Sequence, residues 1–136
     1  MIAAVILAVS LAAMLQFFIS YCRSLLAASA RQPLSAETQD VTGISSRVAA
    51  RSADFQRVMQ LLQLCPERPN DRGGIRAVQL YFRLLNLFRA TLGRIIPSSR
   101  PWTEMQGAQC AYFAAVALDR RIAFSRDTIA AQINLT

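Results

Sequence analysis

The first twenty-two residues of the chain carry no charged side chain, and Arg23 ends this run. A helix over residues 2–22 would extend about 30 Å, because each residue adds about 1.5 Å, and this length matches the hydrocarbon core of a bilayer. A soluble core helix seldom needs so long an unbroken apolar run. The run therefore predicts a single transmembrane anchor, which we place with its juxtamembrane helix in residues 1–31.

The end of the run carries residues typical of a membrane–water interface, namely Phe17, Phe18, Tyr21 and Arg23. Aromatic and basic side chains gather at headgroup level. Arg23 and Arg31 follow the run, whereas only the α-amino group precedes it. The positive-inside rule then predicts an N-terminus outside and the rest of the chain in the cytoplasm. Three widely spaced cysteines fit reduced thiols in that compartment.

Two kinds of processing compete with a permanent anchor. Residues 26–30 end in the small-residue pattern that precedes signal cleavage, which would release an exported helical binding protein after Ala30. The absence of a basic residue before the run, the length of the run and the position of Arg23 oppose this alternative. Residues 19–22 resemble a bacterial lipobox, but Tyr21 stands where that motif needs a small residue. We therefore favour an uncleaved anchor, with Cys22 as a small apolar residue near the membrane edge.

After the anchor, apolar residues recur at helical spacing, and the predicted fold class is all-α: an N-terminal transmembrane helix and a small bundle of three or four helices. Residues 32–43 are polar and contain Pro33 and Gly43, so they predict a linker. Residues 44–136 are the predicted bundle domain. Its helices are expected at about residues 45–65, 75–93 and 101–121, with a short one at 126–133. The predicted helix N-caps are Asn70 or Asp71, Ser99 and Ser125.

Apolar spacing also identifies the faces that these helices bury. The helix at 45–65 has one apolar seam, made of Ile44, Val48, Phe55, Val58, Leu62 and Cys65. Residues 108–118 are uncharged and rich in alanine, and this stretch is too short to span a bilayer, so it predicts a buried helix. Asp119, Arg120 and Arg121 are expected to return that helix to solvent.

The helix at 75–93 combines a wide apolar arc with a line of arginines. Its leucine and aromatic side chains cover about 220° of the helical circumference, so this helix either fills the core or lies on a membrane or a partner. Arg76, Arg83 and Arg94 fall near one line at 100° per residue, which makes them candidate contacts to an anionic surface. Trp102, at the start of the next helix, either anchors at the interface or covers the core.

The chain has a net charge of +7, and all of its basic residues are arginine. A basic balance favours anionic partners such as lipid headgroups, nucleic acid or an acidic protein face, although an arginine-rich solvated surface gives the same composition. Close to an anchor, anionic lipid is the candidate ligand that we prefer to nucleic acid. We do not expect nucleic-acid binding, because no reading motif or surface aromatic series accompanies the arginines.

The sequence predicts no catalytic, cofactor-binding or metal-binding residue. It contains no histidine, its cysteines form no CxxC pair, and its glycines form no phosphate-binding loop. We therefore expect a protein that is not an enzyme. The expected function is that of a membrane-anchored interaction protein, a structural subunit or docking module of a membrane complex, with a protein partner or an oligomer.

Overall fold

The computed structural model describes residues 1–44, 50–65 and 72–135. Within these ranges the chain forms α-helices and one short 3-10 turn, and no strand, so the all-α prediction is confirmed. The elements in chain order are α1 (Ile2–Ala30), α2 (Ala36–Thr42), α3 (Asp54–Leu64), α4 (Arg72–Thr91), the 3-10 turn η1 (Pro97–Ser99) and α5 (Arg100–Leu135).

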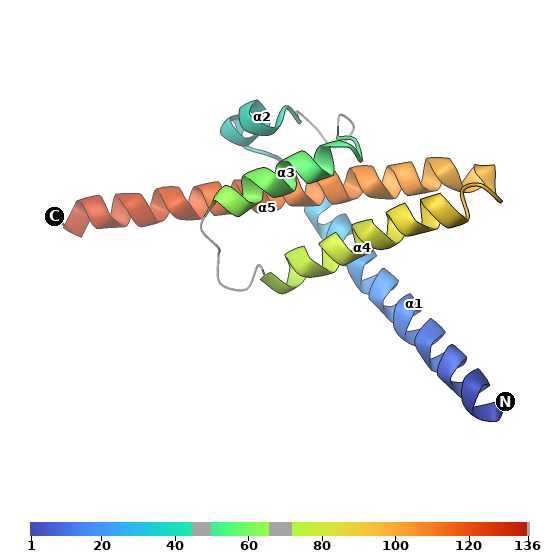
Figure 1. Cartoon of the computed structure of the whole chain (residues 1–136). Helices are drawn as coiled ribbons and strands as arrows, with labels where there is room; N and C mark the ends of the chain where they lie inside the picture. The colour runs from blue at the N-terminus through green and yellow to red at the C-terminus, as the bar shows by residue number, and fades with distance from the viewer. Residues whose placement is uncertain (45–49, 66–71, 136) are drawn as a thin grey trace.

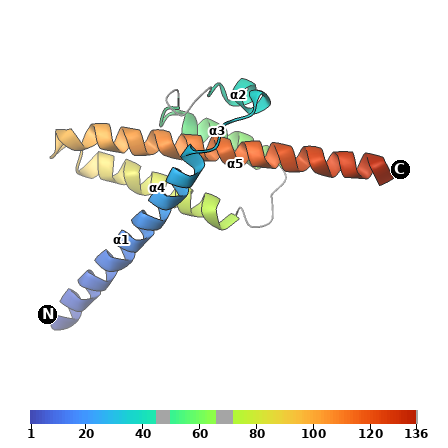
Figure 2. The same ribbon diagram turned by 180° about the vertical axis from the view of Figure 1, so that it is seen from behind.

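Helix α5 is the longest element, and α3 and α4 pack along it (Figure 1). The turn η1 joins α4 to α5, so these two helices form a hairpin. Helix α1 instead crosses α4 and α5 at a steep angle, and its N-terminal half projects away from the other helices (Figures 1 and 2). The N-terminus of α1 and the α4–α5 turn lie on the same side of the molecule, opposite the C-terminus.

Helix α1 has two halves with different surroundings. None of the residues in its most apolar 18-residue window is buried, and the helix is long and apolar enough to cross a membrane. Further along, Cys22, Leu26 and Ser29 are buried against the bundle. The helix has no break between these halves, so the projecting segment and the packed segment belong to one continuous helix.

One hydrophobic core joins α1, α3, α4 and α5. Of the predicted seam, Phe55, Val58 and Leu62 are buried on α3, Ile44 is buried ahead of this helix, and Cys65 is partly buried. Phe55 also meets Phe82 of α4 with 4.1 Å between ring centroids. The middle of α5 supplies small buried side chains that let neighbouring helices approach closely, namely Cys110, Ala111, Ala114, Ala115 and Ala117.

The segment predicted as a linker contains helix α2. Ser35 starts this helix, because its hydroxyl accepts a hydrogen bond from the Thr38 amide, and Gly43 ends it in a left-handed conformation with φ of 74°. The Ser35 and Thr38 hydroxyls both donate to Asp119 of α5, at 2.6 and 2.8 Å. These bonds hold residues 35–43 against the bundle.

Several expected boundaries and caps differ from the structure. Helix α5 continues without a break through residues 122–125, because no proline or glycine interrupts it there, and Ser125 is therefore an interior residue and not a cap. The Ser99 hydroxyl donates to the Ile96 carbonyl and does not cap α5. Helix α3 begins at Asp54, later than expected. Val48, Asn70 and Asp71 lie outside the described residues.

The prediction that Arg121 returns α5 to solvent is wrong. Arg121 is buried, and its Nη1 donates to the Leu62 carbonyl at 2.8 Å. Leu62 lies in the last turn of α3, where carbonyl groups carry partial negative charge, and its carbonyl also accepts a hydrogen bond from the Cys65 amide. The guanidinium thus adds a second hydrogen bond at the end of α3, which sequence spacing alone does not reveal.

Candidate functional site

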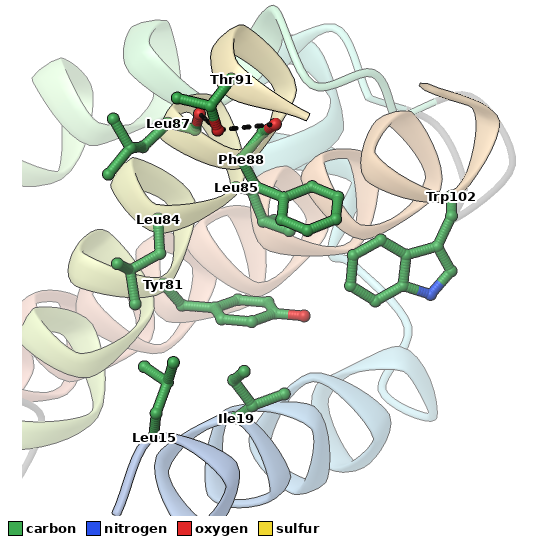
Figure 3. A pocket seen from close by; sticks show the side chains of 9 residues that line it. All are labelled: Leu15, Ile19, Tyr81, Leu84, Leu85, Leu87, Phe88, Thr91 and Trp102. Atoms are coloured by element: carbon green, nitrogen blue, oxygen red, sulfur yellow. Dashed lines mark hydrogen bonds between the residues drawn. The ribbon is translucent and has the colours of Figure 1, made fainter. Parts of the chain in front are cut away.

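A cavity of about 320 Å³ opens where α1 diverges from the bundle (Figure 3). Helices α1, α4 and the first turn of α5 enclose it. We call it the wedge cavity, and its lining consists of Leu15, Ile19, Tyr81, Leu84, Leu85, Leu87, Phe88, Thr91 and Trp102.

The α1 wall of the wedge cavity follows from helical spacing. Leu15, Ile19, Cys22 and Leu26 are separated by four, three and four residues, so they share one face of α1. Cys22 and Leu26 are packed in the bundle core. Because α1 crosses the bundle at an angle, the same face moves away from α4 toward the N-terminus, and Leu15 and Ile19 border an open space (Figure 3).

The α4 wall offers no free polar group to the cavity. The Tyr81 hydroxyl donates to Oε1 of Gln106 at 2.9 Å, and burial raises the pKa of Tyr81 to about 12, so the phenol stays neutral. The Thr91 hydroxyl donates to the Leu87 carbonyl at 2.8 Å within α4. With both hydroxyls bonded inside the protein, the wall presents hydrocarbon.

Trp102 closes the cavity at the end nearest the α4–α5 turn. Its ring meets Phe88 edge-on, with 6.1 Å between centroids. The indole is 39% exposed, so it lies at the edge of the core and is only partly covered. The adjacent turn adds Ile95 and Ile96, which are 73% and 48% exposed. The end of the hairpin therefore presents a group of exposed apolar side chains.

The predicted line of arginines divides into two groups. Arg76 and Arg83 lie exposed on α4, on the face that also carries the exposed Leu80 and Leu87. Arg94 lies beyond the end of α4 at Thr91, so the helical spacing that relates it to the other two does not apply.

Arg94 instead borders a surface depression with Arg89 and Arg100, next to the α4–α5 turn. Arg89 pairs with Glu104 at 3.5 Å, and both side chains are about half exposed. The region around this turn therefore combines arginine side chains with exposed apolar ones.

The residues predicted at the membrane interface differ in their exposure. Phe17 is 77% exposed and Tyr21 is 48% exposed, whereas Phe18 packs partly against the bundle core. Arg23 is exposed and borders a depression shared with Met105 of α5. Only part of the predicted aromatic set is therefore exposed.

The thiols are buried structural groups for the most part. Cys22 and Cys110 are fully buried and Cys65 is partly buried, and none of the three forms a disulfide. Burial, together with the neighbouring Cys22, raises the pKa of Cys110 to about 12. A thiol with this pKa stays protonated at neutral pH and is a poor nucleophile. Within the described residues no cluster of three histidine, cysteine or acidic side chains could hold a metal ion.

Sequence reasoning missed the role of Leu15 and Ile19. Their heptad-like spacing with Cys22 and Leu26 lies inside a run in which nearly every residue is apolar, so the packed face has no contrast with the other faces. Only the three-dimensional position of α1 distinguishes them from the other apolar residues of the run.

Comparisons of the chain with protein-family models, with curated proteins and with solved structures gave no match.

Proposed function

We propose that this chain is an uncleaved, single-pass membrane protein that holds a helical docking domain against the cytoplasmic face of a membrane. The observation that carries the proposal is the continuity of α1. Its projecting half is apolar and unburied, while its other half contributes Cys22 and Leu26 to the bundle core. The anchor and the domain thus share one helix, and the proposal assigns the chain no catalytic role.

The packing of α1 supports retention of the N-terminal segment. Cleavage after Ala30 would remove Cys22, Leu26 and Ser29, which are 0%, 2% and 4% exposed. Loss of these side chains would leave apolar surface of α4 and α5 in water, at about 25 cal/mol for each Å² uncovered. A chain released after Ala30 would therefore be less stable than the full-length protein.

The charge distribution supports the proposed orientation. Arg23 and Arg31 follow the apolar run in the sequence. The exposed arginines of α4 and of the α4–α5 turn also follow it. An anionic cytoplasmic leaflet attracts basic residues near its surface by about 1 kcal/mol each. The bundle is thus better suited to the cytoplasmic side than to the outside.

The distal part of α5 supports a docking role. Beyond the ion pair between Arg126 and Glu37, this helix carries the exposed apolar residues Ile129, Ile133 and Leu135. It extends away from the other helices at the end of the molecule opposite the anchor (Figure 2). This placement keeps the distal part accessible to a protein partner or a second copy.

The proposal is tested by purifying a C-terminally tagged full-length chain from membranes in mild detergent. We expect an intact N-terminus, retention in the membrane after alkaline washing, and a partner protein at fixed stoichiometry. A mature chain that begins at Arg31 would overturn the anchor. An intact chain that purifies alone as a monomer would overturn the docking role while leaving the anchor in place.

A further inference from the structure

We propose that the wedge cavity lies within the cytoplasmic leaflet and that an acyl chain of a bilayer phospholipid fills it. This inference rests on the proposed membrane anchor and specifies how the bundle sits on the membrane. The bundle would then be partly embedded beside its anchor, with the end of the α4–α5 hairpin in the headgroup region.

The first argument is the length of the anchor. A hydrocarbon core needs about 20 helical residues to be crossed, since each residue rises about 1.5 Å. The apolar run ends at Arg23, so a span of this length ends at about residue 22. Leu15 and Ile19 fall inside this span, and both line the wedge cavity. The cavity must then lie at the depth of the leaflet and not above it.

The second argument is the chemistry of the lining. The hydroxyls of Tyr81 and Thr91 are bonded within the protein, so hydrocarbon faces the space. A peptide segment placed there would leave its backbone N–H and C=O groups without partners. A saturated acyl chain has no such groups and fills apolar space without loss of hydrogen bonds. An acyl chain is therefore the occupant that fits.

The third argument is the charge around the α4–α5 turn, close in the chain to Trp102. Arg94 and Arg100 line a separate surface depression beside this turn. Guanidinium groups bind phosphate oxygens through paired hydrogen bonds. Trp102, exposed by 39%, adds an indole that combines apolar and polar surface at this depth.

Trp102 is the only tryptophan of the chain, and it lines the cavity. The test uses the full-length protein in phospholipid vesicles whose acyl chains carry bromine either near the headgroup or near the terminal methyl group. Bromine quenches indole fluorescence only on close approach. We expect bromine near the headgroup to remove most of the Trp102 emission, and bromine near the methyl group to remove much less.

A matched control moves the indole to the other half of α5. Phe124 is 39% exposed, as Trp102 is, and it lies in the half of α5 that is farther along the chain from the α4–α5 turn. The double variant Trp102→Phe, Phe124→Trp should therefore keep its emission in both kinds of vesicle. If the indole at position 124 of this variant is quenched as strongly as Trp102 is in the unaltered protein, the proposal is overturned, because lipid would then reach the bundle without selecting the cavity.

A second pair of variants tests the cavity itself. Leu87 lines the cavity and is 60% exposed, while Leu80 lies on the same helix at 50% exposure and outside the lining. We expect Leu87→Asp to reduce the quenching of Trp102 several-fold, because a carboxylate disfavours an acyl chain beside it. Leu80→Asp should leave the quenching close to that of the unaltered protein, and equal quenching in the two variants would contradict the assignment.

Flotation of the same vesicles distinguishes a failure of the membrane anchor from a failure of the acyl-chain site. If the protein floats with the vesicles and Trp102 keeps its full emission with both brominated lipids, the anchor stands and the acyl-chain site is wrong. If the protein does not float with the vesicles, the anchor is wrong and the acyl-chain site fails with it.

Discussion

The thiol of Cys22 in α1 donates a hydrogen bond to the backbone carbonyl of Ala77 in α4, with 3.6 Å between sulfur and oxygen. Cys22 is fully buried, and the contact joins the helix that carries the apolar run to a helix far along the chain. A domain tethered by a flexible linker would be free to rotate relative to its anchor. Here the bundle packs directly on α1, so any orientation of α1 in a bilayer also fixes the orientation of the bundle.

Leu26→Asp tests the packing of α1 in the core. Leu26 is 2% exposed, so the substitution buries a carboxylate without a cationic partner, and we expect it to abolish cooperative unfolding at a cost of at least about 3 kcal/mol. Ala28→Asp, on an exposed position of the same helix, should change the unfolding midpoint only slightly. The measurement is thermal unfolding of the full chain in detergent, followed by circular dichroism. Equal midpoints for the two variants would show that α1 does not belong to the core.

Leu85→Asp and Leu87→Asp test which face of α4 is core. Leu85 is 5% exposed and Leu87 is 60% exposed, although both belong to the apolar arc that the sequence predicts. We expect Leu85→Asp to unfold the bundle, because an unpaired charge would be buried, whereas Leu87→Asp keeps the helical signal and the unfolding midpoint. Circular dichroism spectra of the two variants give the comparison. A fully helical and cooperative Leu85→Asp protein would refute the core assignment.

The arc of α4 shows how far sequence reasoning reaches. Its width indicates either a core position or a lipid-facing one, and the structure buries only part of the arc: Tyr81, Phe82 and Leu85 are buried, while Leu80 and Leu87 are exposed. Periodicity identifies an apolar surface but not its partner. The partner depends on the crossing of α1 over α4, which local spacing does not determine.

The arginines illustrate a second limit of prediction from the sequence. Arg76 and Arg83 are related by helical spacing, and the structure keeps both exposed on α4. Arg94 departs from the prediction because α4 ends at Thr91, and a helix end is the feature that sequence patterns place least well. Arg121 departs for another reason: its partner is a backbone carbonyl of α3, and backbone carbonyls leave no signature in the sequence.

Gly107→Ala tests the close approach of α5 to the segment before α3. A Cβ at this position would lie 2.6 Å from the Cβ of Ser52, so the backbone near Ser52 must shift. We expect a loss of about 1–3 kcal/mol in the free energy of unfolding, as in other overpacked sites. Gly73→Ala is the matched control, because a Cβ there meets no atom within 4 Å and the residue lies in α4. That variant should keep or slightly raise the free energy of unfolding, because alanine favours a helix more than glycine does, and a Gly107→Ala protein as stable as the parent would contradict the predicted contact.

Alkaline pH tests the burial of Cys110 and Tyr81. Burial raises the pKa of Cys110 from 9.0 to about 12 and that of Tyr81 from 10.0 to about 12, so each group keeps its proton in the folded state when the unfolded chain has lost it. The folded state then binds more protons than the unfolded state, and the free energy of unfolding falls as pH rises. The stabilisation is complete below about pH 9 and is lost progressively toward about pH 12. Because the chain has no lysine and arginine remains charged in this range, the groups that titrate are the cysteines, the tyrosines and the α-amino group. Thermal midpoints from neutral pH upward should therefore decline above about pH 9.

The control is Cys110→Ala. Its thermal midpoint should be lower than that of the parent at neutral pH and should decline less steeply above about pH 9. An identical decline in this variant and the parent would show that Cys110 does not contribute.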